Sequence, residues 1–78
     1  MKTVHVHYFG ELSNEAGMAE EDVDTIAATV GELYDELRTR HGFSMPLVDL
    51  KAAVNAQFRG QGGHVGDGDT VIFAPLIR

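Results

Sequence analysis

Four histidines have the widest chemical range in this sequence, because an imidazole can bind a metal ion or transfer a proton near neutral pH. His5 and His7 are two residues apart, so in a strand both would lie on the same face. His41 and His64 fall elsewhere, at the expected end of a helix and in a loop. The sequence indicates no carboxylate or third ligand that converges on His5 and His7, and it therefore predicts no metal site.

The other residue patterns of a self-sufficient active site are not found in the sequence. The chain has no cysteine, which excludes disulfides, thiol nucleophiles and thiolate metal sites. No serine or threonine has a base at a motif spacing, and no glycine-rich phosphate-binding loop joins a strand to a helix. We therefore expect a protein that binds no cofactor of its own and is not by itself a catalyst.

Residues 66–78 are the most informative segment. The sequence GDGD at its start predicts a tight turn, and residues 70–73 are β-branched or aromatic, as in a central strand. Pro75 cannot donate a hydrogen bond, so strand pairing should stop there or reach an edge. An apolar tail, residues 76–78, follows and predicts insertion into a partner protein, because chain termini are normally polar. The alternative is that this tail has no binding role.

The composition indicates one small domain that spans residues 1–78. Twelve acidic and six basic side chains give a net charge of −6 with neutral histidines, which disfavours binding to nucleic acid and favours a basic protein partner. No apolar run is long enough to span a membrane, and the first residues lack the apolar region of a signal peptide. We therefore expect no membrane association and a cytoplasmic location.

The first third of the chain predicts two strands and a short helix. Residues 3–9 alternate, with the valines facing a core and the first two histidines facing away from it. Residues 11–16 suit a short helix that Gly17 would end in the left-handed conformation. Residues 21–26 suit an acidic edge strand, whose charges would suppress pairing with other chains.

The main helix is predicted to begin at Thr29. Thr29 and Glu32 form a capping box, in which each side chain accepts a hydrogen bond from a backbone N–H group of the first turn. A basic last turn and Gly42 end the helix. Its apolar stripe consists of Val30, Leu33, Tyr34 and Leu37, at helical spacing. Gly31 lies within the first turn, and the sequence offers no reason for it.

The remaining segments complete the predicted fold. Residues 43–50 form a connector with a helical turn after Pro46, residues 51–55 and the region of Phe58 form two short strands, and residues 59–63 form a loop. One helix packed across a small mixed sheet, with the first and last strands adjacent, is the α+β arrangement called β-grasp or ubiquitin-like. The predicted core consists of Val4, Val6, Tyr8, Val30, Leu33, Leu37, Val54, Val71 and Phe73.

The sheet face opposite the helix is the predicted partner surface. If Val71 and Phe73 point inward, Ile72 emerges beside the two histidines of the first strand and forms a modest apolar patch. The predicted partner-binding residues are His5, His7, Ile72, Phe73, Ala74, Pro75, Leu76, Ile77 and Arg78. The alternative is an ordinary exposed face of a small sheet.

Several motifs along the whole chain share their order and spacing with one known family. They are VHYFGELSNEAG at residues 6–17, Thr29-Val30 with Leu33 and Leu37, AAVN at residues 52–55, and DGD at residues 67–69 followed by VIFAP at residues 71–75. With these motifs the chain resembles the MoaD-type small, sulfur-carrying subunit of molybdopterin synthase. It is more distantly similar to the sulfur carriers of the thiamine pathway.

The resemblance implies a ubiquitin-like carrier whose C-terminal tail enters a pocket of the large, catalytic subunit of molybdopterin synthase. It also implies an E1-like partner enzyme that uses ATP to adenylate the tail, which becomes a thiocarboxylate and donates its sulfur to a pterin precursor. The only reactive group that this role assigns to the chain is the terminal carboxylate, here that of Arg78.

The sequence departs from the family pattern at its tail. The family ends in Gly-Gly, which can thread a narrow channel because glycine has no side chain, whereas this sequence ends in Leu76, Ile77 and Arg78. Three interpretations are open: an ordinary carrier that has lost its last residues, a diverged paralogue that binds the large subunit without carrying sulfur, or maturation at Arg78. A chain that ends in Arg78 is predicted to be a poor substrate for adenylation and thiocarboxylation, because a long charged side chain lies beside the carboxylate.

Overall fold

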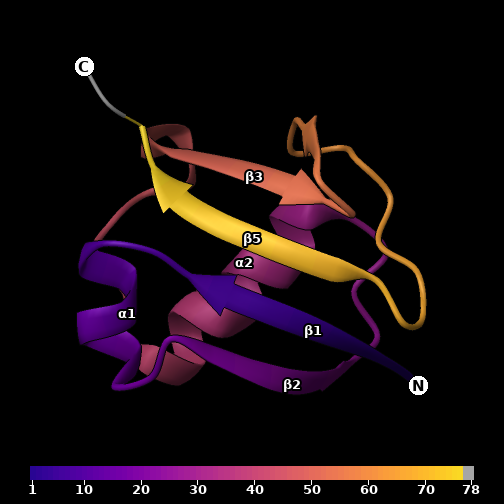
Figure 1. Cartoon of the computed structure of the whole chain (residues 1–78), viewed down its shortest axis with the longest axis horizontal. Coiled ribbons are helices and arrows are strands. Elements are labelled where there is room, and N and C mark those ends of the chain that lie inside the picture. The colour runs from indigo at the N-terminus through magenta and orange to yellow at the C-terminus, as the bar shows by residue number, and fades with distance from the viewer. Residues whose placement is uncertain (77–78) are drawn as a thin grey trace.

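In the computed structural model, which describes residues 1–76, one mixed sheet forms the body of the protein (Figure 1). Its strands, in order across the sheet, are β2 (Glu20–Thr25), β1 (Lys2–Tyr8), β5 (Thr70–Pro75), β3 (Leu50–Val54) and β4 (Gln57–Arg59). β1 and β5 are parallel, and the other neighbours are antiparallel. The predicted β-grasp fold, with the first and last strands adjacent and an acidic edge strand, is confirmed.

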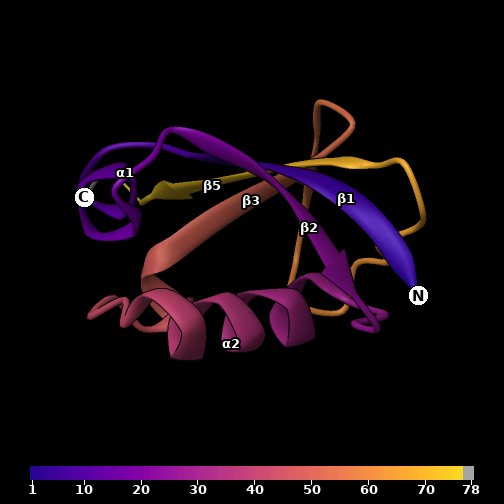
Figure 2. The ribbon, with the colours of Figure 1, turned by 90° about the horizontal axis from the view of Figure 1, so that it is seen from below.

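The helix α2 (Val30–His41) packs across one face of the sheet (Figure 2). Thr29 caps its N-terminus, since the Thr29 hydroxyl accepts a hydrogen bond from the N–H of Glu32 at 3.2 Å. The Glu32 carboxylate reaches one residue further back than a capping box requires and accepts from the N–H of Ala28 at 2.8 Å. Gly42, in the left-handed conformation, ends the helix as predicted.

The structure explains Gly31 through the loop that covers the first turn of α2. The N–H of Gly31 donates to the carbonyl of Gln61 at 2.9 Å, and the N–H of Val30 donates to that of Gly63 at the same distance. A β-carbon at position 31 would lie 3.2 Å from the Gln61 carbonyl oxygen. The loop therefore satisfies N-terminal N–H groups of the helix, and a side chain at position 31 would crowd it.

The core lies between α2 and the sheet, and every predicted core residue is buried, with exposed fractions of at most 6%. The core also contains residues outside that prediction, namely Leu12, Val23, Ala27, Tyr34, Phe43, Ala52 and Val65. Two short elements also pack against the core: α1 (Glu11–Ala16), which Gly17 terminates as predicted, and a 3₁₀ turn, η1 (Leu47–Asp49). No helix within residues 1–76 is both long and apolar enough to cross a membrane.

A partly buried polar network joins the edge strand β2 to α2. The Glu21 carboxylate accepts a hydrogen bond from the Tyr8 hydroxyl at 2.5 Å and lies 2.6 Å from Nε2 of His41. Burial alone would raise the pKa of Glu21, but the hydrogen bonds from Tyr8 and His41 outweigh burial and hold that pKa below its usual value. Burial, reinforced by the hydrogen bond to Glu21, raises the pKa of Tyr8. The network therefore fixes Glu21 as a carboxylate.

Candidate functional site

The face of the sheet opposite α2 has no helix over it in the described part of the chain (Figure 2). Strand alternation places the side chains of His5, His7 and Ile72 on this face, because their neighbours Val6, Val71 and others are buried on the helix side. In the parallel pairing of β1 with β5, His7 lies opposite Ile72. The predicted patch of two histidines and one isoleucine is therefore present, and these three residues are half-buried.

An apolar groove of about 330 Å³ runs along this face beside Ile72. Its lining consists mainly of Phe9, Lys51, Ala53, Phe58, Ile72 and Ala74. Phe58 is 76% exposed and Phe9 is 51% exposed, while the short alanine side chains leave space between the larger ones. The Nζ atom of Lys51 lies 5.8 Å from the centre of the Phe58 ring. Exposed aromatic rings around a groove are a feature of protein-binding surfaces. We call this groove, including Phe9 and Phe58, the outer groove.

A tight hairpin between β3 and β4 holds Phe58 at the outer groove. Asn55 and Ala56 form its turn and have positive φ values of 51° and 70°. The side-chain amide of Asn55 donates to the Asp69 carboxylate, and its carbonyl accepts from the N–H of Thr70, each at 3.0 Å. The hairpin is therefore fixed to the start of β5, which keeps Phe58 in a defined position.

The turn before β5 has the chemistry that the sequence predicts. The Asp69 carboxylate accepts from the N–H of Gly66 at 2.7 Å, the Asp67 carboxylate accepts from the N–H of Thr3 at 2.8 Å, and Gly68 has a φ of 81°. The hydrogen bond from Gly66, with a second from the Asn55 amide, lowers the pKa of Asp69. These contacts fix the register of β5 against β1.

At the other end of β5 the chain leaves the sheet beside the outer groove. Pro75 is the last residue of the strand, and the N–H of Leu76 donates to the carbonyl of Asp49 at 2.8 Å. The Leu76 side chain is 43% exposed. Ile77 and Arg78, which belong to the predicted partner-binding set, lie outside the described residues. β5 is therefore fixed at both ends, and its last residues lie at one end of the groove.

The structure places one member of the predicted partner-binding set in the core, and it shows two further exposed aromatic residues on this face. Phe73 is fully buried, with its ring 5.4 Å from that of Tyr34, so its side chain belongs to the core and cannot also contact a partner. Phe9 and Phe58 replace it as the exposed aromatic residues of this face. The alternation of the first strand already placed Phe9 on the histidine side, whereas nothing in the sequence placed Phe58 there.

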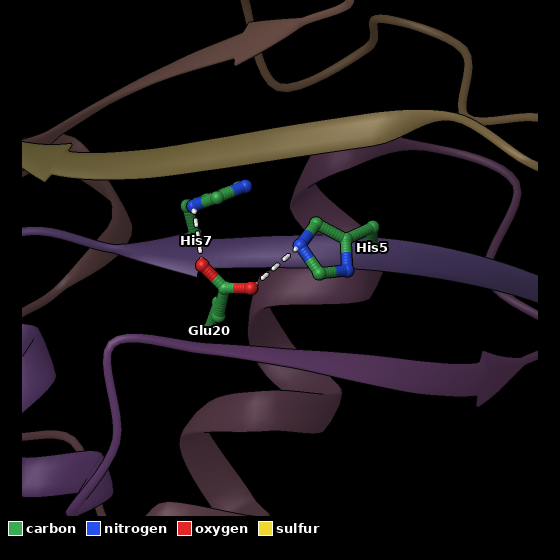
Figure 3. A group of neighbouring side chains, drawn as sticks. All are labelled: His5, His7 and Glu20. Atoms are coloured by element: carbon green, nitrogen blue, oxygen red, sulfur yellow. Dashed lines mark ion pairs between the residues drawn. The ribbon is translucent and has the colours of Figure 1, made fainter.

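The premise that no carboxylate converges on the two histidines is wrong. β2 runs antiparallel to β1 with Glu20 opposite His7 (Figure 3). The Glu20 carboxylate lies 3.4 Å from Nε2 of His5 and 3.6 Å from Nδ1 of His7. The hydrogen bond to Asp22, the other carboxylate at this position, raises the pKa of His5. Sequence reasoning missed Glu20 and Asp22 because the pairing register of the two strands is not visible in the spacing of the residues.

Comparison with solved structures identifies proteins of the same fold. The chain is 28% identical to the putative molybdopterin converting factor, subunit 1, from Pyrococcus furiosus, with a TM-score of 0.83 over 99% of this chain and 100% of that chain. The small archaeal modifier protein 1 of H. volcanii is 19% identical, with a TM-score of 0.81 over 99% of this chain and 100% of that one.

A chain of the protein-protein complex of subunits 1 and 2 of the molybdopterin-converting factor from Helicobacter pylori 26695 is 21% identical, with a TM-score of 0.67 over 97% of this chain and 96% of that one. No curated protein sequence matches the chain. The model of the ThiS family, in contrast, matches residues 6–77. The chain therefore belongs to the ThiS family, and it has the β-grasp fold of the MoaD-type and ThiS-type ubiquitin-like sulfur carriers.

Proposed function

We propose that this protein is the sulfur-carrying small subunit of a molybdopterin synthase. The observation that carries the proposal is the position of the outer groove, which lies on the helix-free sheet face and reaches the end of β5, where the tail leaves. The similarity to the Pyrococcus furiosus protein named as subunit 1 of a molybdopterin converting factor supports it. The Helicobacter pylori complex supports a second subunit as the partner.

In this proposal the large subunit covers the outer groove and receives the tail. Phe58 and Phe9 would supply most of the binding free energy, because exposed aromatic side chains that become buried at an interface act as anchors. The net charge of −6 would speed association with a basic surface on the large subunit. The hydrogen bond from Leu76 to Asp49 would fix the direction in which the tail enters the partner.

The chemistry of the proposal takes place on the terminal carboxylate, in the cytoplasm, and an E1-like enzyme supplies the catalytic groups. A carboxylate oxygen would attack the α-phosphorus of ATP, which releases pyrophosphate and leaves an acyl adenylate. A sulfur donor would then displace AMP and form the thiocarboxylate. The chain itself contributes position, since its fold holds the end of β5, from which the tail extends, at a fixed place beside the outer groove.

Calorimetric titration of the protein into the large subunit from the same host tests the interface. Phe58→Ala should weaken binding at least about tenfold, as expected for an interfacial aromatic anchor. Ile26→Ala is the matched control, because Ile26 is 80% exposed and lies outside the outer groove. Unchanged affinity of Phe58→Ala, or an equal loss for Ile26→Ala, would contradict the proposed interface.

A second candidate function is a binding module that engages the large subunit but carries no sulfur. The outer groove favours it as much as it favours the carrier function, because a groove lined by exposed aromatic residues can bind a partner whether or not the tail carries sulfur. The two functions differ in one measurement: incubation with the activating enzyme, ATP and a sulfur donor, followed by intact-mass analysis.

Replacement of one carboxylate oxygen by sulfur adds about 16 Da, and a misplaced carboxylate would react about a hundredfold more slowly. The assay compares the chain as printed with a version that ends in Gly-Gly. Conversion of the Gly-Gly version supports the carrier function, and failure of both versions supports the binding module. The intact mass of the protein from its native host identifies the residue whose carboxylate is available.

A further inference from the structure

His5, His7 and Glu20 form a compact cluster on the helix-free face, between β1 and the edge strand β2 (Figure 3). One possible ligand atom from each of the three side chains lies within 4.8 Å of the other two. The distances of 3.4 Å from Nε2 of His5 to one Glu20 oxygen and 3.6 Å from Nδ1 of His7 to the other are each close to the ~3.3 Å that separates ligand atoms around a tetrahedral Zn²⁺ with bonds of about 2.0 Å. Small side-chain rotations would therefore bring the three groups to coordination distance.

The backbone places these ligands without any loop. His5 and His7 project from the same face of β1 because they are two residues apart in a strand. Glu20 lies directly opposite His7 in the antiparallel pairing of β1 with β2. The imidazole rings of His5 and His7 approach edge to face, with centroids 4.7 Å apart. A site on paired strands is more rigid than one on a loop, which lowers the entropic cost of binding an ion.

Asp22 orients one of the ligands. It lies opposite His5 in the same pairing, and its carboxylate is 2.6 Å from Nδ1 of His5. When Nδ1–H donates to Asp22, Nε2 carries the lone pair, and Nε2 is the atom that faces Glu20. Histidine ligands of metal ions in proteins commonly donate their other ring N–H to a carboxylate in this way. Asp22 is therefore a positioning residue rather than a ligand.

We propose that this cluster binds one Zn²⁺-type divalent cation through Nε2 of His5, Nδ1 of His7 and the carboxylate of Glu20. Two imidazole ligands favour zinc, cobalt or nickel over magnesium and calcium, which prefer all-oxygen sites. Three protein ligands leave a coordination position for water or for a donor from another molecule. A bound cation would also offset the negative charges of Glu20 and Asp22 and would link the edge strand to β1.

The cation site adjoins the outer groove, because His7 lies opposite Ile72 in the pairing of β1 with β5. A partner on this face would therefore lie within reach of the open coordination position. The proposal does not depend on the proposed sulfur-carrier function, since ion binding is measured on the chain alone. Failure of the sulfur-carrier function would leave ion binding unchanged, and failure of ion binding would leave the sulfur-carrier function unchanged.

The test is calorimetric titration of the protein, without a polyhistidine tag, with Zn²⁺, and optical titration with Co²⁺. We expect one ion per chain. The double variant His5→Gln/His7→Gln should lose affinity at least a hundredfold, and Glu20→Gln should lose it at least tenfold and shift the Co²⁺ absorption bands. Asp22→Asn should weaken binding about tenfold to a hundredfold while the bands stay in place, because it changes no ligand.

The matched control is His64→Gln, which removes an exposed histidine outside the cluster and should bind with affinity within about twofold of the wild type. Thermal unfolding of each variant without metal shows whether it is folded, and Zn²⁺ should raise the unfolding midpoint of the wild type and His64→Gln more than that of the cluster variants. Wild-type affinity in His5→Gln/His7→Gln would overturn the proposal. So would the absence of 1:1 binding at about 1 mM Zn²⁺, in which case the contacts are ordinary histidine–carboxylate ion pairs.

Discussion

The two faces of the sheet differ although the same strands build both. On the helix side, β1 and β5 contribute Val6, Val71 and Phe73, which are fully buried beneath α2. On the opposite side the intervening residues, such as His7 and Ile72, are half-buried and face the outer groove or the histidine cluster. Alternation along a strand thus places core residues on one face and the proposed binding residues on the other, and substitutions on the two faces should have separable effects.

The largest effect should come from the helix side. Leu33→Ala removes a fully buried side chain of α2 and should lower the free energy of unfolding by about 2 to 5 kcal/mol, because it leaves a cavity in the core. Urea unfolding measures this change. A loss below about 0.5 kcal/mol would contradict the assignment of this helix face to the core.

The next effect comes from the polar network at the edge of the core. Tyr8→Phe removes the hydroxyl that donates to the Glu21 carboxylate and should cost about 1 to 3 kcal/mol at about pH 7. Folding lowers the pKa of Glu21. The stabilisation that the Glu21 carboxylate contributes is therefore fully present above the pKa that Glu21 has in the unfolded chain, and it is lost as the pH falls through the pKa of Glu21 in the folded protein. The difference between wild type and Tyr8→Phe should therefore shrink in acid.

The control for this pH dependence is Tyr34→Phe. The Tyr34 hydroxyl donates to the carbonyl of Met45 at 2.6 Å, and a carbonyl does not titrate. Denaturant unfolding from about pH 7 down to about pH 3 should show a constant cost for Tyr34→Phe and a falling cost for Tyr8→Phe. Two parallel curves would show that Glu21 is not the source of the dependence.

A smaller effect of unusual sign is expected at Gly31. Alanine normally stabilises a helix interior by about 1 kcal/mol relative to glycine, but here its β-carbon would press on the Gln61 carbonyl that accepts the N–H of residue 31. Gly31→Ala should therefore destabilise the protein by less than about 1 kcal/mol. Thr39→Ala, on the exposed side of the same helix, should show no such loss. A clear stabilisation by Gly31→Ala in thermal unfolding would indicate that the loop moves freely.

The smallest effect on stability should come from the outer groove. Phe58→Ala removes a ring that is 76% exposed and should change the free energy of unfolding by no more than about 0.5 kcal/mol. The same substitution is the one expected to weaken binding to the large subunit. If unfolding of this variant in urea showed a loss comparable to that of Leu33→Ala, the separation of the two faces would fail.

The fold was accessible from the sequence because its signals are local. Alternation fixed the faces of β1 and β5, and the Thr29 cap and Gly42 fixed both ends of α2. The features that were missed depend on contacts between distant segments. Gly31 makes sense only beside the loop at Gln61, and Glu20 joins His5 and His7 only through the register of β1 with β2.

Phe73 shows a different limit of sequence reasoning. The sequence placed it both in the core and in the partner-binding set, but one side chain can point to only one face of a strand. Phe58, in contrast, sits on the short strand β4, whose position depends on the hairpin turn at Asn55 and Ala56. Neither the exposure of Phe58 nor its place in the same groove as Ile72 follows from residue types alone.

The parallel pairing of β1 with β5 also sets the order of events during biosynthesis. β5 occupies the centre of the sheet, yet the ribosome makes it after the other four strands. Until Thr70–Pro75 emerges, β1 and β3 each lack a neighbour, and the nascent chain exposes two unpaired strand edges and an unfilled core. Such long-range pairing slows folding and leaves these edges open to aggregation until β5 pairs, so a product truncated before β5 should be degraded rather than compete for partners.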